Sequence, residues 1–98
     1  MKLQEVFKAI KDENLSKDSL ESYHTQLSAL CGEMYLEMAQ FQKEQAIYLA
    51  ESEEKTTAGA ERKWFALPKG QRQIELKNYI RATEKQLSSI KNRLYSVY

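Results

Sequence analysis

Two long runs of apolar residues at helical spacing, separated by the only proline of the chain, set the strongest limit on its fold. Steps of three and four residues place each run on one face of a helix. Proline lacks an amide hydrogen and restricts the residue before it, so Pro68 predicts a break between the two helices. The first stripe consists of Leu20, Tyr23, Leu27, Leu30, Cys31, Met34, Met38, Phe41, Tyr48 and Leu49, and the second of Leu76, Tyr79, Ile80, Thr83, Leu87, Ile90, Leu94 and Val97.

These two stripes predict an all-α fold, in which a long antiparallel helical hairpin forms one domain over residues 1–98. An acidic helix over 18–52 and a basic helix over 71–97 are joined by a connecting segment, 55–70, that is irregular or a short helix. At 1.5 Å per residue, the apolar stripe from about Ser19 to Ala50 alone extends over about 48 Å. A two-helix layout buries little apolar surface, so we expect a homo-oligomer, with dimers that form a bundle or coiled coil.

A short amphipathic helix over residues 1–12 is predicted by the spacing of Leu3, Val6, Phe7 and Ile10. After it, either Ser16 or Asp18 can cap the long acidic helix, and Glu21 stands three residues after Asp18, as a capping box requires.

Leu36 and Ile47 fall outside the first stripe, on nearly the opposite side of the same helix. The simpler interpretation is that the N-terminal helix covers them. The functional interpretation is a surface for a dimer or a partner.

Charge is divided unequally along the chain. Residues 1–54 contain five Lys and no Arg against eleven acidic residues, whereas residues 55–98 contain ten Lys and Arg against three Glu. The two halves of a hairpin therefore attract each other.

Catalytic chemistry lacks the necessary residues. His24 and Cys31 are the only histidine and cysteine, and two helical turns separate them by about 10 Å, too far for proton transfer. Glu21 and His24 have the spacing found in di-metal bundles, to which Glu75 or Glu84 would add carboxylates, but a two-residue motif is common by chance. We expect no enzyme activity, metal or cofactor.

Localisation follows from the cysteine count and from hydropathy. A single cysteine forms no intrachain disulfide, which fits a reducing compartment. No run approaches the roughly 20 apolar residues of a membrane span, and no signal-peptide run stands at the start. We expect a cytoplasmic protein that does not associate with membranes.

Nucleic acid is the first candidate partner, because cations gather along the predicted last helix. In addition, Trp64 and Phe65 stand beside Arg62 and Lys63 and offer a surface on which an unpaired base can stack. The alternative is that these cations neutralise the acidic helix, and their distance from its carboxylates decides between the two. The candidate nucleic-acid-binding residues are Arg62, Lys63, Trp64, Lys69, Lys77, Arg81, Lys85 and Lys91.

Residues 45–95 resemble short helical accessory proteins encoded by phages and prophages. The matching segments are Glu54-Lys55-Thr56, Glu61-Arg62-Lys63-Trp64 and the run from Lys85 to Leu94. Proteins of this kind are encoded among early genes for recombination and DNA handling, so the resemblance implies an accessory role in the host cytoplasm. It carries over no catalytic residue, and Pro68 departs from the pattern.

We therefore predict a non-enzymatic accessory protein that associates with DNA or a DNA-processing complex through its basic last helix. One alternative is an inhibitor of a host nuclease or anti-phage defence complex, in which acidic side chains mimic phosphates. Another is a self-assembling structural component. The alternative partner-binding residues are Leu36, Glu37, Glu44, Ile47, Glu51 and Glu53.

Overall fold

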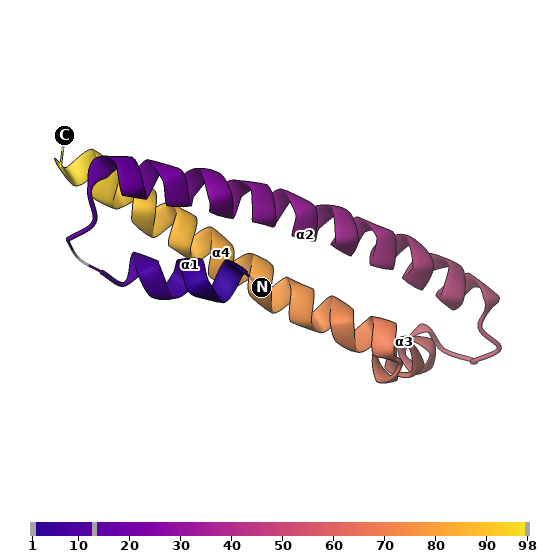
Figure 1. Cartoon of the computed structure of the whole chain (residues 1–98). Helices are drawn as coiled ribbons and strands as arrows, with labels where there is room; N and C mark the ends of the chain where they lie inside the picture. Colours follow the sequence, from indigo (N-terminus) through magenta and orange to yellow (C-terminus); the bar gives the residue numbers. More distant parts are fainter. Residues whose placement is uncertain (1, 13, 98) are drawn as a thin grey trace. The chain divides into compact units, whose positions relative to one another are not determined.

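The computed structural model describes residues 2–12 and 14–97, and all secondary structure in these ranges is α-helical (Figure 1). The helices are α1 (Lys2–Ile10), α2 (Lys17–Glu51), α3 (Thr57–Ala66) and α4 (Pro68–Val97). No helix in the described ranges is long and apolar enough to cross a membrane.

The chain forms two compact units, each built from parts of both long helices. Unit 1 contains residues 1–33 and 80–98, and unit 2 contains residues 34–79. Unit 1 combines the first half of α2 with the last part of α4, and unit 2 combines the second half of α2 with the start of α4, so the two helices pair in opposite directions. The predicted all-α antiparallel hairpin is confirmed.

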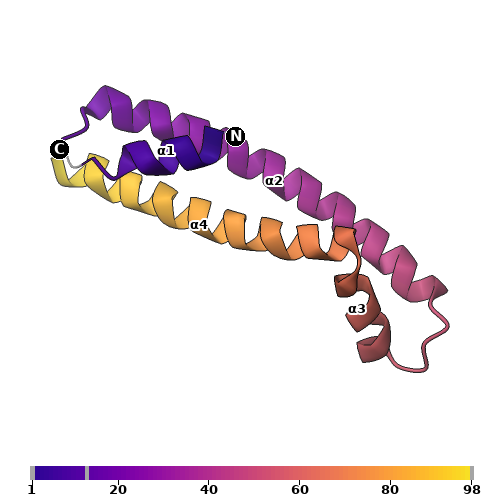
Figure 2. The same ribbon diagram turned by 60° about the horizontal axis from the view of Figure 1, so that its bottom comes forward.

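The core of unit 1 is apolar and comes from three helices. Figure 2 shows α1 between the first part of α2 and the last part of α4. The side chains that close this core are Leu3, Val6, Ile10, Leu20, Leu27, Cys31, Ile80, Thr83 and Ile90. They come from the predicted stripes and from the predicted amphipathic helix, whereas the side chain of Val97 lies outside the described part of the chain.

Two side chains fix the ends of the unit 1 helices. Ser16 caps α2, because its Oγ accepts a hydrogen bond from the amide of Ser19 at 3.1 Å. The Arg93 guanidinium donates hydrogen bonds to the carbonyl oxygens of Ile10, at 2.7 Å, and Asp12, at 2.6 Å. It thereby satisfies carbonyl groups that the C-terminus of α1 leaves without helical partners.

The core of unit 2 is centred on Trp64 of α3, which is 3% exposed. Its indole Nε1–H donates to Gln73 Oε1 at 2.7 Å, and Gln73 Nε2 donates to Gln45 Oε1 at 2.9 Å. The ring of Tyr48 lies 5.5 Å from the Trp64 ring between centroids. These contacts connect α3 with both α2 and α4, which explains why the segment before Pro68 is an ordered helix.

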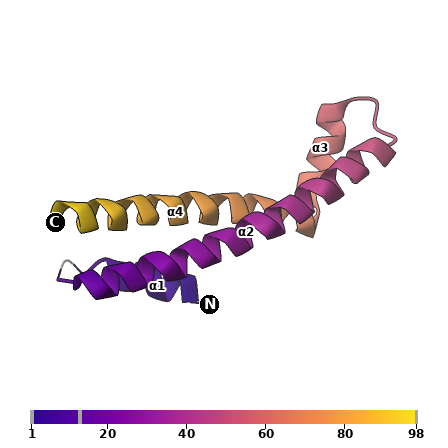
Figure 3. The ribbon, with the colours of Figure 1, turned by 90° about the horizontal axis from the view of Figure 1, so that it is seen from above.

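A sharp turn at Leu67 separates α3 from α4 (Figures 2 and 3). Leu67 is extended, with ψ of 155°, as expected for a residue before proline. Pro68 is the first residue of α4, a position where its missing amide hydrogen costs no helical bond. The predicted break at Pro68 is thus present, and the last helix begins three residues before the predicted Gln71.

Close packing at this turn requires a glycine. A Cβ on Gly70 would lie 2.6 Å from Phe65 Cα and would also clash with the carbonyl of Trp64. The amide of Gln71 donates to the Leu67 carbonyl at 3.0 Å, and its side-chain Nε2 donates to the Phe65 carbonyl at 2.5 Å.

One expectation about packing is wrong. The N-terminal helix was expected to cover Leu36 and Ile47, but α1 belongs to unit 1, whereas both residues belong to unit 2. Their side chains are 75% and 50% exposed. The reason is that α1 has nine residues and buries its own apolar face in the core of unit 1.

Candidate nucleic-acid interface

Two of the predicted cations have a carboxylate partner within unit 2. Lys69 Nζ lies 3.4 Å from Glu44 Oε1, and Lys63 pairs with Glu54. Arg72, a further cation of α4, contacts Glu37 at 3.1 Å and Glu75 at 2.7 Å. Lys63 and Lys69 therefore match the alternative interpretation, in which cations neutralise the acidic helix and its neighbours.

These ion pairs also change the pKa values of the cations. The hydrogen bond with Glu54 raises the pKa of Lys63. The hydrogen bond with Glu37 raises the pKa of the Arg72 guanidinium. Both side chains stay charged at neutral pH, and their charge is directed at a neighbouring carboxylate.

The prediction that Trp64 offers a surface for an unpaired base is wrong. The side chain is 3% exposed and its one polar hydrogen is used by Gln73. The sequence placed Trp64 beside two cations, but the helical period directs Trp64 inward while Arg62 and Lys63 face solvent.

The cations on the last part of α4, in unit 1, lie in a different environment. Arg81, Lys85 and Lys91 are exposed, and none of the ion pairs found among the described residues includes them. Arg81, Lys85, Ser88 and Asn92 follow one another at spacings of four, three and four, which places them on one face of the helix. We call these four residues the α4 polar face.

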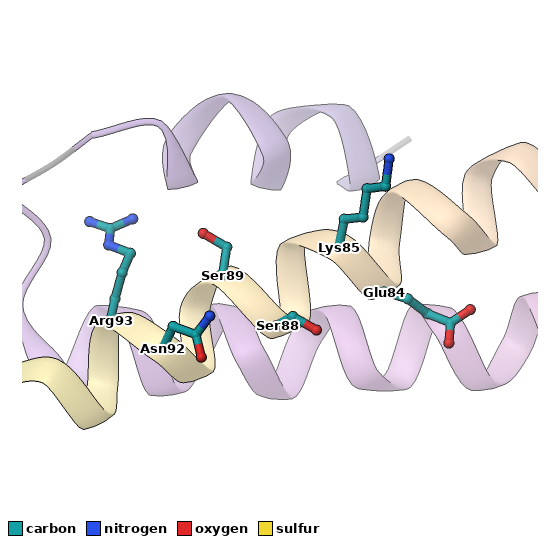
Figure 4. A pocket seen from close by; sticks show the side chains of 6 residues that line it. All are labelled: Glu84, Lys85, Ser88, Ser89, Asn92 and Arg93. Atoms are coloured by element: carbon teal, nitrogen blue, oxygen red, sulfur yellow. The ribbon is translucent and has the colours of Figure 1, made fainter.

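A shallow depression lies along this part of α4, lined by Glu84, Lys85, Ser88, Ser89, Asn92 and Arg93. Figure 4 shows Lys85, Ser89 and Arg93 directed to the side of α1, and Glu84 directed to the other side of α4. Ammonium, guanidinium, hydroxyl and amide groups all donate hydrogen bonds to phosphate oxygens. Glu84 is the one acid among residues 80–97, which contain four cations.

Tyr95 is an aromatic residue of unit 1 that sequence reasoning missed. Its side chain is 72% exposed, and Lys91 Nζ lies 5.9 Å from its ring centroid. A usable signal was present: on an ideal helix Tyr95 is about 100° from the centre of the second stripe, so its ring was not needed in the core.

The two remaining predicted cations lie in unit 2. Arg62 on α3 and Lys77 on α4 are exposed, and the ion pairs found in the described ranges include neither. Of the predicted set, Arg81, Lys85 and Lys91 thus lie in unit 1, whereas the others lie in unit 2.

The alternative partner-binding residues divide into two groups. Glu37 and Glu44 contact Arg72 and Lys69, so their charge is largely compensated. The other four, Leu36, Ile47, Glu51 and Glu53, are exposed. With Tyr35, which is 49% exposed, Leu36 and Ile47 leave apolar surface on α2 of unit 2.

The candidate metal ligands do not gather into one cluster within the described ranges. No three His, Cys, Asp or Glu side chains in these ranges could hold one metal ion. Glu21 and His24 do line one depression together, which is a different one from that along α4. Burial raises the pKa of the Cys31 thiol, and the negative charge of Glu84 raises it further. Cys31 therefore has the character of a core residue, not of a nucleophile.

No protein-family model, curated protein or solved structure matches the chain. The resemblance to phage-encoded accessory proteins remains a prediction.

Proposed function

We propose that this chain is a non-enzymatic accessory protein that associates with DNA through the last part of α4. The observation that supports this function is the exposure of Arg81, Lys85 and Lys91 in unit 1 without a carboxylate partner among the described residues. The phage-type resemblance of residues 45–95 points to the same role.

The chemistry of the α4 polar face suits the sugar-phosphate backbone and not a particular base sequence. Lys and Arg release counterions when they neutralise phosphates, and Ser and Asn side chains add neutral hydrogen bonds. The net charge of the whole chain is only +1, so we expect moderate affinity that falls steeply with salt.

The direct test is fluorescence anisotropy with labelled single- and double-stranded oligonucleotides at low salt. Arg81→Glu combined with Lys85→Glu should lower affinity about tenfold or more and reduce the slope of log K against log salt by about 2, because two phosphate contacts are lost.

The matched control is Lys43→Glu combined with Lys55→Glu. Both lysines are exposed residues of unit 2, and the pair produces the same change in net charge. Its affinity should stay within about twofold of the parent protein, since salt largely screens exposed charges that lie more than a Debye length from the bound DNA. Equal loss in both double variants, or no binding by the parent protein at about 50 mM salt, would refute DNA association through α4.

Protein binding is the second candidate function, favoured by the 75% exposure of Leu36. In this proposal α2 of unit 2 docks on a basic host protein, with Glu51 and Glu53 beside an apolar contact. Capture of the partner from infected or lysogenic cells should then be lost with Leu36→Gln and Ile47→Gln and kept with Arg81→Glu and Lys85→Glu. The opposite result would exclude this surface.

A further inference from the structure

A second depression of unit 1 lies between the first turns of α2 and the last turns of α4. It has a volume of about 560 Å³ and is lined by side chains that include Lys17, Glu21 and His24 of α2 and Lys91, Leu94 and Tyr95 of α4. Small-molecule sites have volumes of about 300–1,000 Å³. The depression is therefore large enough for one nucleotide unit.

One wall of this depression is apolar and flat. Tyr95 is 72% exposed, although its ring is a large apolar surface, and the half-buried Leu94 continues that surface. Every nucleobase has a π-face that stacks on an aromatic ring, whatever its sequence. A base that stacks on Tyr95 would cover area that the fold leaves in water.

The rim of the depression provides two kinds of polar group. The Lys91 ammonium lies over the Tyr95 ring, 5.9 Å from its centre. A base that stacks on this face displaces the ammonium, and the exposed lysine side chain is long enough to pair with the phosphate of that base. On the α2 side the Glu21 carboxylate lies 3.9 Å from Lys17, beside His24. A carboxylate accepts hydrogen bonds from base amino and imino groups and repels phosphate, so the base edge should face α2 and the phosphate should face Lys91.

We infer that this depression holds the base of an unpaired nucleotide, stacked on Tyr95, with its phosphate at Lys91. The inference rests on the proposed association with DNA and adds the class of nucleic acid to it. Bases in a duplex are stacked on one another and do not reach a side-chain ring without being flipped out. The protein should therefore prefer single strands to duplexes.

The experiment compares the binding of a 15-residue oligothymidylate with that of a 15-base-pair duplex at the same ionic strength. The parent protein should bind the single strand about tenfold more tightly, as expected for one stacked base. Tyr95→Leu should remove this preference and leave duplex affinity within twofold, whereas Tyr95→Phe, which retains the ring, should keep it. Circular dichroism should show the same helix content for both variants, because the side chain is largely exposed.

The possible outcomes separate this inference from the proposed function. Equal affinity for both DNAs, unchanged by Tyr95→Leu but reduced by the Arg81 and Lys85 reversals, would overturn the base site and leave DNA association in place. A single-strand preference that Tyr95→Leu does not change would also overturn it. Failure of the parent protein to bind either DNA would refute both proposals.

Discussion

The two units contain the same kinds of residue, and several of these residues are used in opposite ways. In unit 2, Lys63, Lys69 and Arg72 contact carboxylates of their own chain, and the aromatic Trp64 is buried. In unit 1, the α4 cations Arg81 and Lys85 are exposed, and so is an aromatic ring. Whether a basic residue is structural or available for binding thus depends on the acid that faces it, not on its position in a basic run.

The difference follows from how each core is held together. Unit 1 buries the apolar faces of three helices, with Arg93 as the basic side chain that fastens α1. Unit 2 adds polar contacts to its apolar core, because α3 docks through the hydrogen bonds from Trp64 to Gln73 and on to Gln45. Unit 2 therefore uses polar groups for its own stability that unit 1 leaves at the surface.

The largest expected difference between the units concerns their aromatic residues. Trp64→Ala should lower the free energy of unfolding by about 3–5 kcal/mol, since it leaves a cavity and removes the partner of Gln73. Tyr95→Ala should change it by less than about 0.5 kcal/mol, because the ring is mostly in water. Urea unfolding followed by circular dichroism measures the free energy of unfolding of both variants. Equal losses of stability would contradict the proposed difference between the two aromatic residues.

A smaller effect is expected at the turn between α3 and α4. Gly70→Ala should destabilise unit 2 by about 2–3 kcal/mol, because the new methyl group meets the backbone of Trp64 and Phe65. Gly32→Ala is the matched control: a Cβ there has no atom within 4 Å, and alanine favours the helix by about 1 kcal/mol. The two variants should shift the thermal midpoint in opposite directions, and a stabilising Gly70→Ala would show that the turn is packed differently.

A smaller loss of stability than at Gly70 is expected at Arg93. Arg93→Met should cost about 1–2 kcal/mol, since two charged hydrogen bonds to the end of α1 are lost. The neighbouring Lys91→Met, at an exposed position, should cost less than about 0.5 kcal/mol. Hydrogen exchange of the α1 amides provides the sharper measurement, because protection of α1 should fall in the Arg93 variant alone. Equal protection in both variants would show that Arg93 does not stabilise the end of α1.

Helical periodicity predicted most of the fold, because burial follows the spacing of apolar residues. Leu27, Leu76 and Ile90 are all 0% exposed, as members of the predicted stripes should be. The start of α4 at Pro68 could not be predicted from periodicity. It depends on a proline that is the first residue of the helix and on the close contact of Gly70 with α3, and neither residue belongs to the apolar stripe.

The candidate site was less predictable, since charge compensation depends on tertiary contacts. A basic run gives no sign that Lys69 meets Glu44 across the hairpin while Lys85 meets no acid among the described residues. Nor do the neighbours of Trp64 show that its indole points inward. Tyr95 was detectable through its angle from the apolar stripe, but its proximity to Lys91 and to the depression beside α2 required coordinates.

The central claim is that nucleic acid contacts the unit 1 part of α4 and not the paired cations of unit 2. An NMR titration of the isotope-labelled protein with a short single-stranded oligonucleotide tests this residue by residue. The account predicts amide shifts concentrated over residues 81–95, with little change at Lys63, Lys69 and Arg72. Shifts concentrated over residues 36–51, or none at all at millimolar DNA, would contradict it.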